Sequence, residues 1–146
     1  MASPSVSVGL RMGDVIVTST YSPGPGTYVD KFPAVKSLST DAVAIGNNVL
    51  SGLDQFVDGG PWPVDWSSYQ SPTLAVAGIP TWQEYERGLR TCVVERHEDH
   101  LCVRSERPHQ TLSLDVTKAQ IGEAVLQSLG TTLKRERAWH ERHQSK

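Results

Sequence analysis

The residues best suited to chemistry gather in one stretch of the chain. Between residues 92 and 109 the sequence carries two thiols and three imidazoles: Cys92, His97, His100, Cys102 and His109. Closed zinc sites use such ligands in pairs like C-x-x-C, and these spacings form no such pair. We therefore interpret the stretch as a polar hairpin turn with two small buried thiols. A small metal-binding protein or enzyme using Cys92, His97, His100 and Cys102 remains the alternative.

Other catalytic patterns are weaker. Four carboxylates surround the tip of the same expected hairpin: Glu95, Glu98, Asp99 and Glu106. Little would bury them there, so nothing would tune a pKa for acid–base work. His140 and His143 form an H-x-x-H on a charged tail, without the H-E-x-x-H arrangement of zinc proteases. The sequence also has no nucleophile elbow, phosphate-binding loop or dinucleotide fingerprint, so we expect no enzyme, catalytic residue, metal or cofactor.

The geometry of the hairpin can be predicted more closely. A two-residue turn at Glu98 and Asp99 would pair Cys102 with Glu95, so that the two thiols would not face each other. Alternation along the strands would also send several of the histidines and cysteines to different faces. We expect two reduced, structural thiols.

Composition indicates an ordinary globular protein. The chain has 146 residues, 38% of them hydrophobic and 21% charged, with a formal net charge of −2. This size supports one hydrophobic core, and the charge balance gives no reason to expect nucleic-acid or membrane binding. No apolar run approaches the ~20 residues of a membrane helix, and the N-terminus lacks the features of a secretory signal. These features favour the cytoplasm.

The expected strands form hairpins. Residues 14–21 alternate and are β-branched, residues 22–26 read SPGPG, and residues 27–32 can return as a second strand. A second hairpin is expected over residues 89–106, and a further strand near residues 110–116. Between them, residues 57–73 form a long irregular connection, followed by a short helix at residues 80–88 with Thr81 as its cap.

The same short helix occurs twice. Residues 37–53 read SLSTDAVAIGNNVLSGL, and residues 113–129 read SLDVTKAQIGEAVLQSL. The first helix is expected to begin after Thr40 or Asp41 and to run to about Phe56, and the second to begin after Thr117. Apolar residues at four-residue spacing give each copy one apolar stripe. Gly46 and Gly122 occupy the same place in the two copies, which suggests close approach of another element.

These elements predict an α+β fold: a mostly antiparallel sheet with two similar amphipathic helices packed on it. Residues 1–130 would form this single domain, with the helix echo at 37–53 and 113–129. Residues 131–146 would be a basic C-terminal tail, helical or frayed and mostly solvated.

A surface for binding another protein is better supported than an active site. Between Lys36 and Arg87 the chain has six acidic residues and no basic one, together with three tryptophans. Aromatic anchors with nearby carboxylates suit a protein interface, and carboxylates can occupy the surface that a nuclease uses for phosphates. The candidate partner-binding residues are Asp54, Asp58, Trp62, Asp65, Trp66, Tyr69, Glu84 and Glu86.

At family level, the region from Tyr28 to Leu129 resembles immunity proteins of bacterial contact-dependent growth inhibition systems. The resemblance is carried by short motifs: Ala77-Gly78-Ile79, Thr81-Trp82, Tyr85, the hairpin from Cys92 to Val103, and Ile121-Gly122-Glu123-Ala124-Val125-Leu126. It implies a small cytoplasmic antitoxin that binds one cognate toxin domain, often a nuclease, and inhibits it stoichiometrically without a cofactor. The tail after Gly130 lies outside the resemblance. A structural or adaptor subunit, with the two helices as a dimer face, is a third possibility.

Overall fold

The structure is a computed structural model that describes residues 2–63, 70–105 and 109–144. In chain order the strands of these residues are β1 (Ser5–Arg11), β2 (Asp14–Gly24), β3 (Thr27–Leu38), β4 (Val57–Asp58), β5 (Arg90–Arg96), β6 (His100–Arg104) and β7 (Gln110–Ser113). The helices are α1 (Ala42–Asp54), α2 (Pro72–Ala77), α3 (Trp82–Tyr85), α4 (Lys118–Ser128) and α5 (Leu133–His143).

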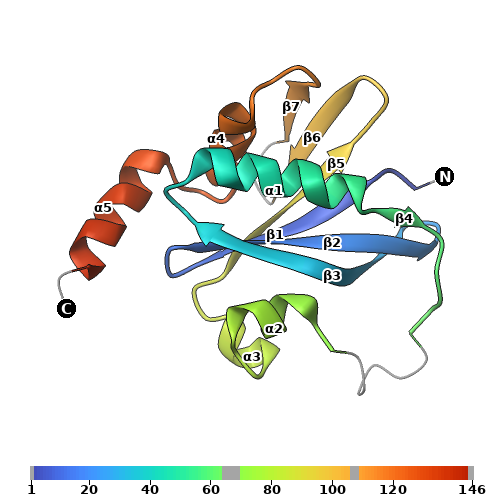
Figure 1. Cartoon of the computed structure of the whole chain (residues 1–146), viewed down its shortest axis with the longest axis horizontal. Coiled ribbons are helices and arrows are strands. Elements are labelled where there is room, and N and C mark those ends of the chain that lie inside the picture. The colour runs from blue at the N-terminus through green and yellow to red at the C-terminus, as the bar shows by residue number, and fades with distance from the viewer. Residues whose placement is uncertain (1, 64–69, 106–108, 145–146) are drawn as a thin grey trace.

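All the strands belong to one sheet, and its order mirrors the chain. The order is β3-β2-β1-β5-β6-β7, with antiparallel neighbours throughout, and the short β4 pairs in parallel with β2. Each half of the chain therefore forms three antiparallel strands followed by a helix, and the first strands of the two halves, β1 and β5, meet at the centre (Figure 1). The expected α+β fold is confirmed.

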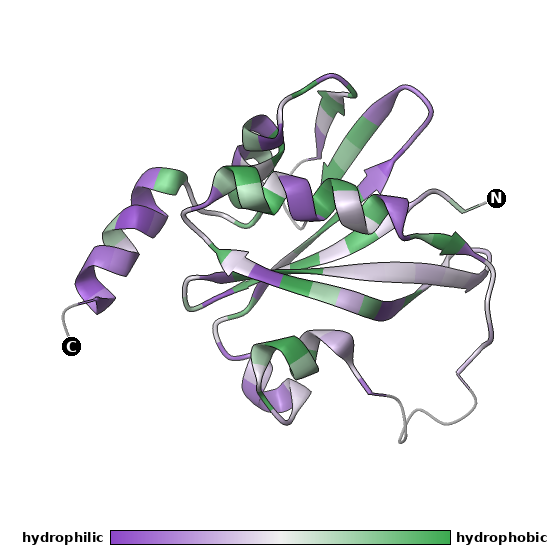
Figure 2. Cartoon of the chain, in the orientation of Figure 1, coloured by the Kyte–Doolittle hydropathy of each residue, from purple (hydrophilic) through white to green (hydrophobic). Residues whose placement is uncertain are grey.

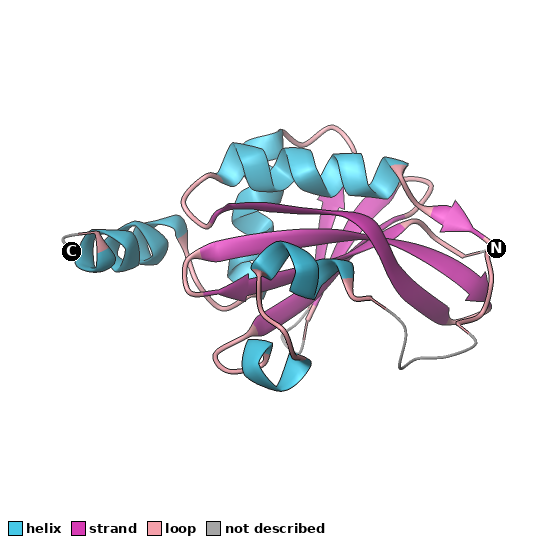
Figure 3. Ribbon diagram, turned by 60° about the horizontal axis from the view of Figure 1, so that its bottom comes forward, coloured by secondary structure: helices cyan, strands magenta, loops and turns pink. Residues whose placement is uncertain are grey.

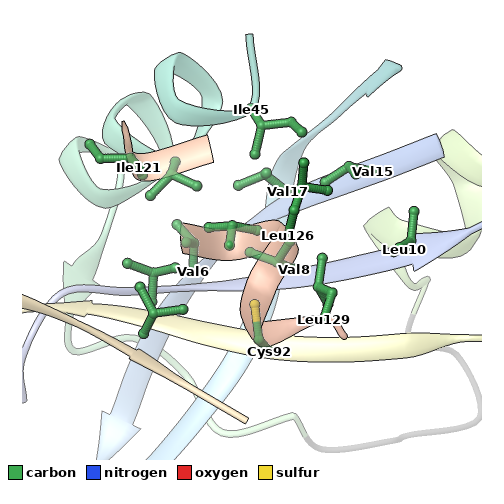
Figure 4. Packing of buried hydrophobic residues seen from close by; sticks show 14 of the residues in the cluster. Val6, Val8, Leu10, Val15, Val17, Ile45, Cys92, Ile121, Leu126 and Leu129 are labelled. Carbon is green, nitrogen blue, oxygen red and sulfur yellow. The ribbon is translucent and has the colours of Figure 1, made fainter. Parts of the chain in front are cut away.

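One face of the sheet forms the hydrophobic core. Alternate residues of β1, β2, β5 and β6 point to this face, and α1 and α4 cover it. Figure 4 shows part of this packing, in which Ile45 and Ile121 from the helices lie over valines of the strands. The core residues from the helices are Ile45, Val49, Leu53, Ile121, Val125, Leu126 and Leu129. Each helix packs through the apolar stripe that the sequence predicts.

Gly46 and Gly122 pack the two helices against each other. A Cβ added at Gly46 would lie 1.9 Å from the carbonyl oxygen of Lys118, and one added at Gly122 would lie 2.0 Å from that of Ala42. Ala42 and Lys118 are themselves equivalent positions at the first turns of the two copies. The contact is therefore reciprocal, because each glycine packs against the backbone at the start of the other helix.

The opposite face of the sheet is largely polar and carries α2 and α3. Val17 points into the core, so its neighbour Thr18 points to the other face, where its hydroxyl lies 2.7 Å from that of Thr73 on α2. Ser5 and Thr20 also form a hydrogen bond on this face, at 3.0 Å. Figure 3 shows α2 and α3 lying across the strands from α1. The sheet is thus a central layer between unlike helical layers.

Several elements differ from the sequence expectation. The strand β1 at the centre of the sheet and the helix α2 were not predicted, and β3 runs on to Leu38, beyond the expected Phe32. Helix α1 ends at Asp54 with Asp41 as its N-cap, and α4 begins after a capping box formed by Thr117 and Gln120. The predicted Glu98–Asp99 turn is confirmed, because Glu95 pairs with Cys102.

Residues 133–143 form α5, whose surface is mostly hydrophilic (Figure 2). The helix is held to the β1–β2 turn. His140 Nε2 lies 3.1 Å from Gly13 O and 3.0 Å from Ser39 Oγ, and Trp139 lies so close to Gly13 that a Cβ there would be 2.5 Å from its ring. Glu136 is buried and accepts a hydrogen bond from Thr131. Among the described residues, no helix is both long and apolar enough to cross a membrane.

Candidate partner-binding surface

Asp54 lies at the end of α1 and already has a partner within the chain. Its Oδ1 accepts a hydrogen bond from Arg96 Nη1 of β5 at 2.8 Å, and its side chain is 69% exposed. An exposed ion pair of this kind contributes about 0–1 kcal/mol to stability, so it can be exchanged for a partner's cation at small cost.

Asp58 and Trp62 follow on the segment that leaves α1. Asp58 is exposed on β4, which pairs with the end of β2, and the hydroxyl of Tyr21 donates to Pro61 O at 2.9 Å. Trp62 packs against Gly24 at the end of β2 while 56% of it remains exposed. An indole held on one side and open on the other is a suitable anchor for a partner.

The remaining described candidate carboxylates, those of Glu84 and Glu86, lie on or beside α3. Glu84 and Glu86 are exposed, and Thr81 caps the helix by accepting a hydrogen bond from Glu84 N at 3.2 Å. Trp82 is 41% exposed and packs edge-on against the buried ring of Tyr85, with 5.7 Å between centroids. This gives a second group of exposed carboxylates within four residues of an exposed indole.

The structure does not join these residues into one surface. Asp54, Asp58 and Trp62 lie at the end of α1 and on β4, whereas Glu84 and Glu86 lie with α3 on the other side of the sheet (Figure 1). The predicted residues Asp65, Trp66 and Tyr69 lie outside the described residues. The described residues of the acidic segment therefore form two separate groups and not one continuous surface.

Sequence reasoning missed a groove beside the second group. A cavity of about 820 Å³ lies between β3 and the α2–α3 segment, lined by Tyr28, Asp30, Gln70, Leu74, Ile79 and Trp82 among others. Burial raises the pKa of Asp30, and the hydroxyl of Ser7, which donates to its Oδ1 at 3.0 Å, lowers it in part. The N-terminal signature of α2, Ser71 followed by Pro72, was the signal that could have located one wall.

The hairpin residues considered for metal binding are divided between environments. Cys92 lies in the core, and burial raises the pKa of its thiol to about 12. Cys102 lies on the opposite face beside Glu95, which pairs with Arg104. His97 stacks on His100 with 4.8 Å between centroids. Within the part of the chain that the structure describes, no three such side chains are grouped to hold a metal ion.

A structural or adaptor subunit would use α1 and α4 as a dimer face, but the apolar stripes of both helices are buried within the chain. The buried faces of both helices pack on the sheet and on each other. An adaptor role would therefore need the outer, polar sides of these helices.

Comparison with known proteins identifies the fold. No protein-family model matches the sequence, and comparison with curated proteins gives no match. A protein of unknown function from Neisseria meningitidis has a similar structure, with a TM-score of 0.70 and 15% identity over 88% of this chain and 94% of that one. A chain of a CdiA-CT/CdiI toxin and immunity complex from Yersinia pseudotuberculosis is similar with a TM-score of 0.64 and 13% identity, over 89% of this chain and 97% of that one. The chain has the fold of these proteins.

Proposed function

We propose that this protein is a bacterial immunity protein that neutralises one cognate toxin domain by binding it. The likeness to a chain of a toxin and immunity complex, over 89% of this chain and 97% of that one, carries the proposal. The sequence motifs between Tyr28 and Leu129 resemble those of immunity proteins, which favours the inhibitor over the toxin. The proposed role is non-enzymatic and needs no cofactor.

The charge distribution supports a basic partner. A nuclease domain binds phosphate through cations, and exposed carboxylates beside an aromatic anchor can occupy such a surface. Asp58 and Trp62, and likewise Glu84 and Trp82, are exposed and close in sequence, so each pair provides this combination. An inhibitor of a nuclease would act in the compartment that holds the nucleic acid, the cytoplasm.

The first experiment is co-purification of this chain with the toxin domain encoded beside it, followed by kinetic binding measurements. Asp58→Lys and Glu84→Lys reverse one charge in each group. Glu123→Lys, at an exposed position of α4 outside both groups, is the matched control. A charge reversal in the interface should slow association roughly ten-fold or more at low salt, with a smaller effect at high salt.

The variants show which of the two acidic groups contacts the toxin, and the wild-type chain tests the proposed function itself. A loss confined to Asp58→Lys assigns binding to the end of α1, and a loss confined to Glu84→Lys assigns it to α3. If neither variant differs from Glu123→Lys, the interface lies elsewhere, with Glu98 and Asp99 of the hairpin tip the next candidates. Absence of any complex with the wild-type chain would contradict the proposed function.

A further inference from the structure

A pocket of about 370 Å³ lies where α5 meets the β1–β2 turn and the segment before β5. Its charged and aromatic lining residues are Arg11, Arg90, Arg135, Glu136, Trp139 and Arg142. Four arginines thus line one small pocket in a chain whose formal net charge is −2. None of the residues that line this pocket also lines the groove described above.

The four arginines that line the pocket carry more charge than the one lining glutamate can balance. Among the described residues, none of the four arginines forms an ion pair within 4.0 Å. Glu136 is the one carboxylate among the described lining residues, and it accepts a hydrogen bond from Thr131 Oγ1 at 2.8 Å. Asp14 is the ladder partner of Arg11 but does not line the pocket. Like charges that line one pocket repel each other unless an anion lies between them.

Two of the arginines are held in place by the backbone. Arg90 Nη1 donates to Gly130 O at 3.1 Å and to Leu129 O at 3.4 Å, and Arg11 Nε donates to Arg87 O at 3.1 Å. A guanidinium has five N–H donors, so each group retains donors for a ligand. Fixing the side chain beforehand lowers the entropy lost when a ligand binds.

The other two arginines are positioned by the docking of α5. Arg135 and Arg142 lie on this helix, which His140 and Trp139 hold against Gly13. The pocket therefore exists because α5 is folded and attached, and the basic tail that the sequence showed supplies half of its cations.

We propose that this pocket binds the phosphoryl groups of a small ligand, with a diphosphate such as that of a nucleoside diphosphate as the best match. The planar fork of arginine fits phosphate oxygens in pairs, and two adjacent phosphoryl groups supply the charge that four arginines and one glutamate require. The volume falls within the range of small-ligand sites. The arginines line one concave pocket rather than a stripe, which favours a small ligand over a nucleic-acid backbone.

The test uses the full chain alone, so its result does not depend on any toxin. Inorganic pyrophosphate and ADP are titrated calorimetrically at fixed ionic strength into the wild type, Arg135→Gln and Arg142→Gln. Arg137→Gln is the matched control, because it removes the same charge from the same helix at an exposed position that does not line the pocket. We expect one site for each ligand, and a Kd about ten-fold or more higher in the two pocket variants but unchanged in the control.

The Tm of each variant without ligand shows whether the variant is correctly folded. It should not fall in Arg135→Gln or Arg142→Gln, because removing one of several like charges relieves repulsion. Binding of pyrophosphate and ADP with equal Kd values would assign recognition to the diphosphate alone, as proposed. Failure of both to bind the wild type would overturn the inference. So would an equal loss in Arg137→Gln, or tight binding of a DNA duplex that all three variants weaken alike, since either would indicate diffuse charge.

Discussion

At the scale of single residues, the two thiols show how strand alternation sets reactivity. Cys92 points into the core beneath the helices, whereas Cys102 lies half-buried on the polar face beside Glu95. The thiolate is the reactive form, so a thiol whose pKa is raised to about 12 reacts slowly at neutral pH.

We therefore expect a disulfide exchange reagent to modify Cys102 of the native protein first at pH 8, while Cys92 reacts only as the chain unfolds. The measurement is the rate of modification in Cys92→Ser and Cys102→Ser variants, with and without urea. Equal rates for both thiols in the native state would contradict the burial of Cys92.

Asp30 provides a second residue-level prediction. Burial raises its pKa above the ordinary 3.8, so the native state holds this proton more tightly than the unfolded chain does. The carboxyl therefore costs stability progressively as the pH rises from about 3.8 through its raised native pKa.

Asp30→Asn removes this titration and can still accept the hydrogen bond from Ser7. We expect the stability of the variant relative to the wild type to be greater at neutral pH than at acidic pH. Urea unfolding at about pH 3.5 and about pH 7 measures this difference. The same relative stability at both pH values would show that Asp30 does not titrate as described.

At the scale of elements, the packing of α1 on α4 depends on the two equivalent glycines. Alanine is the better helix former by about 1 kcal/mol. However, an added Cβ would lie only 1.9 or 2.0 Å from a backbone oxygen, which leaves no room for a methyl group. The close approach of the helices thus outweighs helix propensity.

We expect Gly46→Ala and Gly122→Ala each to lower the free energy of unfolding by about 1–3 kcal/mol, despite the gain in propensity. Ser51→Ala, at an exposed position of α1, is the control and should be neutral or slightly stabilising. Chemical denaturation measures all three. A stabilised Gly46→Ala would show that the helices are not in contact there.

Local patterns account for which elements could be predicted. Alternation, turn residues and caps located both hairpins and the two equivalent helices, because these signals lie within short segments. The central strand β1 has the same alternation, with Val6, Val8 and Leu10 in the core, so the same signal could have predicted it. Helix α2 is six residues long, too short to show a periodic stripe.

The candidate site was less predictable than the fold. Sequence identified exposed acids and tryptophans, but nothing in it indicated that Asp58 and Glu84 lie on different sides of a sheet. The arginine pocket was equally hidden, since Arg11, Arg90 and Arg135 come from three distant segments. Sites assembled from separate elements require the tertiary fold.

At the scale of the whole molecule, the two similar halves form the sheet and its hydrophobic core, and the segments outside them carry the proposed functions. The acidic and aromatic groups lie on the connection between α1 and β5, and the arginine pocket depends on α5. This division allows the connecting segments to vary for a particular partner while the sheet and its two helices are retained.

The proposed function is inhibition of a toxin domain by stoichiometric binding, and an activity titration tests it most directly. The activity of a fixed concentration of the cognate toxin domain, well above the Kd, is measured as this protein is added. We predict a linear fall that ends at one equivalent and reverses when the complex is dissociated. Unchanged toxin activity at excess protein, or complete inactivation by a small fraction of an equivalent, would contradict the account.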